Sequence, residues 1–230
     1  MRNIMPVRLR WDLYGLGPFF VAFAVIQILS IIFLYAAPNT DSWRQTVFFL
    51  FDLVIPLLFS SLVLFVFSRD ITPKNISFLF SLPLKMGSFI LLRYIRLFLF
   101  WWLLCIPFLL ACYGSMPQTD SAAVINVGHI LSAAFAFLPN TLCFAAVSLL
   151  LLTVTKSTFS PFILLFGVST FDFCTFGKIL GVFSVTANYY TELKSTDLFF
   201  ANRLLFLCFG FIGPILSYIK MKTDYIRNKG

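Results

Sequence analysis

Charged side chains are scarce in this chain of 230 residues, and their scarcity excludes an ordinary water-soluble globular protein. Only 11% of the residues are charged, whereas 60% are hydrophobic and 31 are phenylalanine. A soluble domain carries about 25% charged residues. Because the mean hydropathy is +0.95, most of the surface must be solvated by lipid rather than by water.

Residues suited to catalysis and metal binding are also few. His129 is the single histidine, which excludes a metal site with two histidines from this chain. The five cysteines lie inside apolar runs without a C-x-x-C pair, as expected of small apolar filler. The nucleotide-binding pattern G-x-x-x-x-G-K-S/T is absent, as are H-E-x-x-H and G-x-S-x-G. We therefore expect no catalytic, cofactor-binding or metal-binding residue here, and no enzyme activity in this chain.

Long apolar stretches predict an all-α integral membrane protein with six transmembrane helices. A helix needs about 20 apolar residues to cross the hydrocarbon core. Residues 1–230 show no internal repeat and no soluble module, so we expect a single transmembrane domain. The predicted spans are Gly17–Ala37, Thr46–Phe67, Leu97–Met116, a stretch within Ala122–Val154, Thr158–Phe176 and Phe199–Ile219.

The basic residues predict the orientation of these helices. Of the 17 lysine and arginine residues, all but four fall on the side of the predicted bundle that holds both termini. The four exceptions are Arg44, Lys178, Lys194 and Arg203. Because cytosolic segments of membrane proteins are enriched in Lys and Arg, both termini are predicted in the cytosol and the chain in the cytoplasmic (inner) membrane. The net charge of +8 thus reflects topology, and no nucleic-acid partner is expected.

A short half-polar segment between the second and third spans predicts a helix over residues 72–82. Thr72 offers a capping hydroxyl, and Pro73 suits the first helical position. Pro83 disfavours helix at Leu82 and ends the element. An apolar stripe follows at helical spacing: Ile76, Leu79, Phe80, Pro83 and Leu84. Two interpretations remain open, an interfacial anchor that fixes the tilt of the neighbouring spans and a docking element that presents Phe78 to a cytosolic partner.

This segment resembles the coupling-helix region of ABC-2 type transporter permeases. In that family an acidic residue after the second span precedes a short helix, an SLP-like turn, a basic residue and the third span. Here Asp70 is followed by FLFSLPLK at Phe78–Lys85 and then by LLRYIRLF. The six-span plan, Asn202-Arg203 at the start of the last span and the basic tail Lys220–Lys229 are also similar. The chain departs from the family's Thr-Leu-Glu-like helix start, where it has Asn75-Ile76-Ser77.

The resemblance implies the membrane subunit of an ATP-driven exporter. Two cytosolic ABC ATPase subunits would bind ATP and Mg and would grip the coupling helix. A second copy or a related permease would complete the path for an amphipathic, lipid-like, peptide or antibiotic cargo. The family also carries an amphipathic helix before the first span; residues 1–16 fit either that helix or a plain basic flank. The implied docking residues are Asp70, Lys74, Ile76, Phe78, Leu79, Phe80 and Leu82.

Asp52 and Asp172 lie inside predicted spans near the outer side, where a charge is costly and is by default a functional-site hypothesis. In one interpretation they line an outer-leaflet cavity and contact a cationic or amphipathic substrate, on a substrate path that includes Asn126 and His129 on one face of the fourth span. In the other, which nearby basic residues favour, Asp52 pairs with Arg44 and Asp172 with Lys178. Two further classes of function stay open: a non-transporting scaffold or regulatory subunit, and an ion-coupled transporter, for which two acids offer little material.

Overall fold

The computed structural model describes residues 17–36, 40–71, 75, 86–114, 127–175, 177–185 and 196–229. Every regular element in these ranges is helical, which confirms the predicted all-α class. The elements are α2 (Gly17–Tyr35), α3 (Thr40–Phe49), η1 (Leu50–Val54), α4 (Ile55–Ser68), α6 (Met86–Gly114), α7 (Val127–Thr155), α8 (Phe159–Cys174), η2 (Gly181–Phe183) and α9 (Thr196–Lys229).

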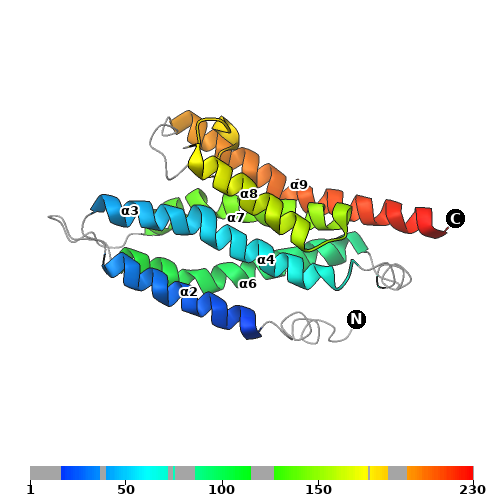
Figure 1. The fold of residues 1–230 in the computed structure, drawn as a ribbon, viewed down its shortest axis with the longest axis horizontal. Coiled ribbons are helices and arrows are strands. Elements are labelled where there is room, and N and C mark those ends of the chain that lie inside the picture. Colours follow the sequence, from blue (N-terminus) through cyan, green and yellow to red (C-terminus); the bar gives the residue numbers. More distant parts are fainter. Residues whose placement is uncertain are drawn as a thin grey trace.

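The helices run in alternating directions along one elongated bundle (Figure 1). Helix α7 is central, because it packs against α4, α8 and α9. Helix α6 contacts α2, α4 and α9. The start of α2, the end of α4, the start of α6 and the end of α9 lie at one end of the bundle, here called the terminal end. The start of α3, the end of α8 and the start of α9 lie at the other, here called the distal end.

Five of the helical stretches in the described residues are long and apolar enough to cross a membrane. They are Gly17–Tyr35, Gln45–Ser68, Gly87–Ala111, Ala136–Thr155 and Asp197–Arg227. These stretches indicate a multi-pass membrane protein and correspond to five of the predicted spans. The remaining one, α8, is apolar but has only 16 residues, about 24 Å of helix against a hydrocarbon core of about 30 Å. A sixth complete span therefore stays a prediction.

Aromatic side chains join α4, α6 and α7 in the core. Phe51 stacks on Phe137 with ring centroids 4.6 Å apart and on Phe108 at 5.5 Å. One turn or two further along, Phe59 lies against Phe98 and Trp101. Such pairs add to the energy of burial through favourable ring geometry, and Phe brings no polar atom that needs a partner. The many phenylalanines of the sequence thus serve partly to connect helices and partly to face lipid.

Small residues bring α7 and α9 into close contact. A Cβ added at Gly213 would lie 2.7 Å from Ala146 Cβ, and one at Gly210 would lie 2.7 Å from Leu142 Cβ. In membranes, small residues at helix interfaces let the two backbones approach each other. Tyr94 of α6 also donates a hydrogen bond to the Leu142 carbonyl, at 2.8 Å. The seam between α7 and α9 is therefore a tightly packed part of the bundle.

Two predicted spans differ in length from the helices that contain them. The second is part of a longer run, Thr40–Ser68, in which η1 is π-helical. The sixth lies within α9, which has 34 residues and continues well past Ile219. The predicted interfacial helix of residues 1–16 lies outside the described residues, and so does the coupling helix of residues 72–82 apart from position 75.

Candidate functional site

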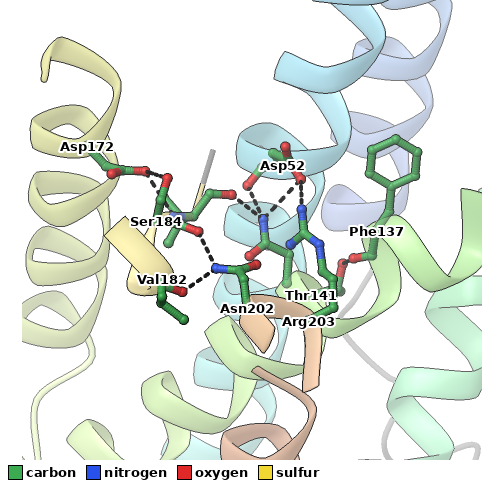
Figure 2. Close-up of polar contacts among 10 residues, drawn as sticks. Asp52, Phe137, Thr141, Asp172, Val182, Ser184, Asn202 and Arg203 are labelled. Carbon is green, nitrogen blue, oxygen red and sulfur yellow. Dashed lines mark hydrogen bonds and ion pairs between the residues drawn. The ribbon is translucent and has the colours of Figure 1, made fainter. Parts of the chain in front are cut away.

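A network of buried polar side chains occupies the distal end of the bundle (Figure 2). Its members come from four parts of the chain: η1, α7, the segment from α8 through η2, and α9. Most of these side chains have no exposed surface: Asp52, Asn140, Asp172, Ser184 and Arg203 are each 0% exposed, and Asn202 is 1% exposed. Burial of two acids and an arginine among apolar helices requires that they stabilise one another.

Asp52 enters the network through an irregular turn of helix. In η1 the N–H of Ile55 donates to the Leu50 carbonyl, five residues back rather than four. Pro56 then has no N–H to offer the Asp52 carbonyl. Asn140 of α7 takes that place, since its Nδ2 lies 3.0 Å from the Asp52 carbonyl oxygen and 3.2 Å from Oδ1. The π-helical turn thus presents both the backbone and the side chain of Asp52 to α7, a frequent use of such turns at functional sites.

Arg203 reaches Asp52 from α9. Its Nη2 lies 3.4 Å from Asp52 Oδ1, and both side chains are fully buried. The guanidinium also lies over the ring of Phe199, 5.1 Å from the centroid. Its Nε and Nη1 have no hydrogen-bond partner among the residues that the structure describes. Arg203 is thus held by one long ion pair and one ring face, although it carries five N–H donors.

The chain folds back over Asp172 after α8. Gly177 has a positive φ of 70° and donates its N–H to the Asp172 carbonyl at 2.9 Å. This conformation suits glycine and closes the end of the helix. The returning segment then places the Ser184 hydroxyl and the Val185 N–H each 2.9 Å from Asp172 Oδ2. Asp172 therefore binds the segment 177–185 to α8.

Asparagine side chains tie the same segment to the other helices. Asn202 of α9 donates to the carbonyls of Val182 and Ser184, at 2.6 and 2.9 Å. Asn140 of α7 donates to the carbonyl of Val185 at 2.6 Å. The segment 177–185 is consequently held by α7, α8 and α9 at once.

The structure describes only some of the four residues that the sequence suggested for a substrate path. Asp52 and Asp172 belong to one network, although they lie 120 positions apart in the sequence. The structure pairs Asp52 with Arg203, which the sequence assigned to an outer segment. The pairing of Asp52 with Arg44 stays a prediction, because the side chain of Arg44 lies outside the described part. The pairing of Asp172 with Lys178 stays a prediction. His129 lies in the first turn of α7, but its side chain is not described, and Asn126 lies outside the described residues.

Sequence reasoning missed Asn140, Asn202 and Arg203 as members of this network. A signal was present, because each interrupts a run of apolar residues, and polar groups at membrane depth normally pair with one another. What the sequence lacked was the partner of each group. No cluster of three or more His, Cys, Asp or Glu side chains that could hold a metal occurs among the described residues.

A second set of ion pairs lies at the terminal end. Asp70, just after α4, pairs with Arg93 of α6, and their side chains are 26% and 10% exposed. The Arg93 guanidinium also lies 5.3 Å from the centroid of the Phe67 ring. Further along this end, Asp224 of α9 accepts from Lys220 at 2.9 Å and lies 3.5 Å from Lys156.

Of the predicted docking residues, only Asp70 is described. The others lie outside the described part of the chain: Lys74, Ile76, Phe78, Leu79, Phe80 and Leu82. Asn75, the one described position within residues 72–85, donates from its side chain to the Arg69 carbonyl.

Comparison with known proteins assigns no family to the chain: no family model, no curated protein and no solved structure matches it.

Proposed function

We propose that this chain is the membrane-spanning permease subunit of an ATP-driven exporter of the ABC-2 type. It would lie in the cytoplasmic membrane with both termini in the cytosol, paired with a second copy or a related permease. Two cytosolic ATPase subunits would bind ATP and Mg and hydrolyse ATP on its behalf. The cargo would be amphipathic: a lipid-like molecule, a peptide or an antibiotic.

The observation that carries this proposal is the ion pair of Asp70 with Arg93. It joins the end of α4 to the first turns of α6, at the two points between which residues 72–85 run. A force applied to that segment by a partner would act on α4 and α6 together, since a charged hydrogen bond couples them. The acidic residue that the resemblance singled out therefore has a mechanical role in this proposal.

The packing of the bundle offers a route from the terminal end to the distal end. Helix α4 packs along α7, and α7 packs along α9 at the close seam of Gly210 and Gly213. At the distal end the same three helices meet in the network of Asp52, Asn140 and Arg203. Tightly packed helices shift as rigid elements rather than deform. Closure of the ATPases would thus reach the distal network through α4, α7 and α9.

Purification of the native complex in mild detergent tests the proposal. We expect two ATPase subunits and two permease subunits by native mass spectrometry. Isolation of this chain with partners that bind no nucleotide would contradict it and favour the scaffold. Transport that collapses with an ionophore but survives ATP depletion would contradict it and favour an ion-coupled carrier.

A pair of matched substitutions tests the docking segment. We expect Phe78→Asp to release the ATPase while leaving membrane insertion intact, because a charge replaces an apolar contact. Phe159→Asp is the control: Phe159 begins α8 and is 76% exposed, and an acid is tolerated in a first helical turn. Equal ATPase retention by both variants would remove the docking role of Phe78.

A further inference from the structure

The guanidinium of the distal network uses few of its hydrogen-bond donors. Asp172 Oδ2 accepts two hydrogen bonds at 2.9 Å, and Asp52 Oδ1 accepts from Asn140 and Arg203. Arg203, by contrast, has one partner at 3.4 Å and leaves Nε and Nη1 without a hydrogen bond in the described part of the chain. The unused donors of Arg203 carry positive charge, so their natural ligand is an anion.

A buried guanidinium with unused donors is costly. Leaving a charged group without its hydrogen bonds costs more than leaving a neutral one, and the penalty grows in an apolar surrounding. The Oδ1 atoms of Asn140 and Asn202 also lack partners there, but they are neutral acceptors. A buried arginine with unused donors persists at membrane depth most readily where it has a function.

Arg203 is itself fully buried, but apolar side chains beside it on α9 are exposed. On α9 its neighbours Phe200 and Leu204 are 48% and 56% exposed. Helix α8 packs on α7 and α4, whereas α9 meets η2 and α7. The Asn202 side chain bonds the segment 177–185 to α9 through Val182 and Ser184. Displacement of that segment would bring Arg203 to the lipid boundary, with apolar side chains beside it.

We propose that Arg203 binds the anionic headgroup of an amphiphilic cargo, a carboxylate or a phosphate, which replaces Asp52 as its partner. This inference rests on the proposed export function and names the class of cargo. The acyl chain would lie along the exposed apolar side of α9. Asp52 would keep the Asn140 amide as a donor, so the exchange breaks one long ion pair and forms charge-assisted bonds to unused donors. The network that joins η1 to α9 would open as the cargo binds.

Headgroup selectivity tests this proposal directly. The full-length chain in a non-ionic detergent is titrated, under native mass spectrometry, with amphiphiles that share one oleoyl or oleyl chain: oleate, oleoyl lysophosphatidate, monooleoylglycerol and oleylamine. We expect one or both of the anionic compounds to bind at least about tenfold more tightly than the other two. The two anionic compounds separate a carboxylate cargo from a phosphate cargo. Equal binding of all four, or preference for the amine, would overturn the proposal.

Substitution of Asp52 should strengthen anion binding rather than weaken it. Asp52→Asn removes the competitor for Arg203, so the favoured anion should bind about tenfold more tightly than it does to the natural chain. In Asp52→Asn/Arg203→Gln the pair is neutral, which avoids an unpaired buried charge, and headgroup selectivity should disappear. Asp224→Asn, which alters a carboxylate paired at the terminal end, should change nothing. Unchanged or weaker anion binding by Asp52→Asn would contradict the exchange.

A thiol provides a second readout that does not need these variants. Cys143 is buried against Val185 and Phe206, next to the network, whereas Cys105 is buried in the other core cluster, on α6. Cys105 and Cys143 are kept, and the remaining three cysteines are changed to alanine. The favoured anion should then speed maleimide labelling of Cys143 severalfold and leave the labelling rate of Cys105 unchanged. Labelling of Cys143 that does not respond to the anion would contradict opening of the network.

The two proposals can fail separately. Headgroup binding is measured on this chain alone, while the exporter assignment depends on which subunits co-purify. Anion-selective binding without an ATPase partner would leave Arg203 as a headgroup site and remove the exporter. A complex of two ATPases and two permeases without headgroup selectivity would do the reverse.

Discussion

The two ends of the bundle hold their charges in opposite ways. At the distal end Asp52 and Arg203 have no exposed surface, and the ion pair is long. At the terminal end Asp70, Asp224, Lys156 and Lys220 all keep some contact with the exterior. Charges that retain water are easily stabilised and contribute little. Charges that lose water depend wholly on one another, so the distal pair is the one whose rearrangement carries a large free energy.

In the proposed exporter, whose terminal end would face the cytosol, this difference would give the two ends separate roles. The terminal end is suited to contact with a cytosolic partner, because its charged groups are accessible. The distal end is suited to switching, because Arg203 has one long ion pair in this structure and unused donors that a second partner could take. A transporter needs both properties, at opposite faces of the membrane.

The largest effect should come from removing one distal charge. Asp52→Ala leaves Arg203 as an uncompensated buried cation and should lower the free energy of unfolding by about 3–5 kcal/mol. Asp224→Ala removes a partly exposed carboxylate at the terminal end and should cost about 1 kcal/mol or less. Both are measured by unfolding in mixed micelles of increasing SDS content. Adding Arg203→Leu to Asp52→Ala should recover most of the loss; similar costs for the two single variants would erase the contrast between the ends.

A smaller loss of stability is expected from a substitution that disturbs the packing of α7 against α9. Gly213→Ala places a Cβ 2.7 Å from Ala146 Cβ and should cost about 1–3 kcal/mol, because α7 and α9 must move apart. Gly167→Ala on α8 is the matched control, since nothing lies within 4 Å of the added Cβ. It should be neutral or stabilising by up to about 1 kcal/mol, as alanine favours helix. The same unfolding assay applies, and a neutral Gly213→Ala would mean that the seam is not tightly packed.

The smallest effect on stability should accompany a large effect on coupling. Asp70→Asn weakens a partly exposed ion pair and should cost about 1 kcal/mol or less, while Arg93 keeps its contact with the Phe67 ring. Transport per ATP hydrolysed should nevertheless fall, because α4 and α6 no longer move together. The reversed pair Asp70→Arg/Arg93→Asp should restore part of the coupling. Full coupling in Asp70→Asn would show that the ion pair transmits no force.

Much of the fold could be predicted because it depends on local properties. Runs of about 20 apolar residues predict helices directly, and the bounds of α2 lie close to the predicted Gly17–Ala37. The length of α9 was harder to predict, because its continuation from Lys220 is helical but polar. The shortness of α8 depends on Gly177 and on the hydrogen bonds that draw the chain back over Asp172.

The candidate site was predictable only in part. Asp52 and Asp172 are conspicuous in a chain with so few charges. The partners of Asp52 are not, because Asn140 and Arg203 are distant in sequence and lie on other helices. Local proximity pointed to Arg44 as a partner of Asp52 and gave no sign of Arg203, which the structure brings to Asp52 across 151 positions.

Composition and the order of apolar runs determined by themselves that this is a helical membrane protein, because the cost of placing backbone and side chains in lipid is a local quantity. Only the tertiary structure decided which buried charges meet and which of their hydrogen-bonding atoms remain unused. Those facts follow from how helices rotate and pack against one another, and a linear pattern does not contain that information.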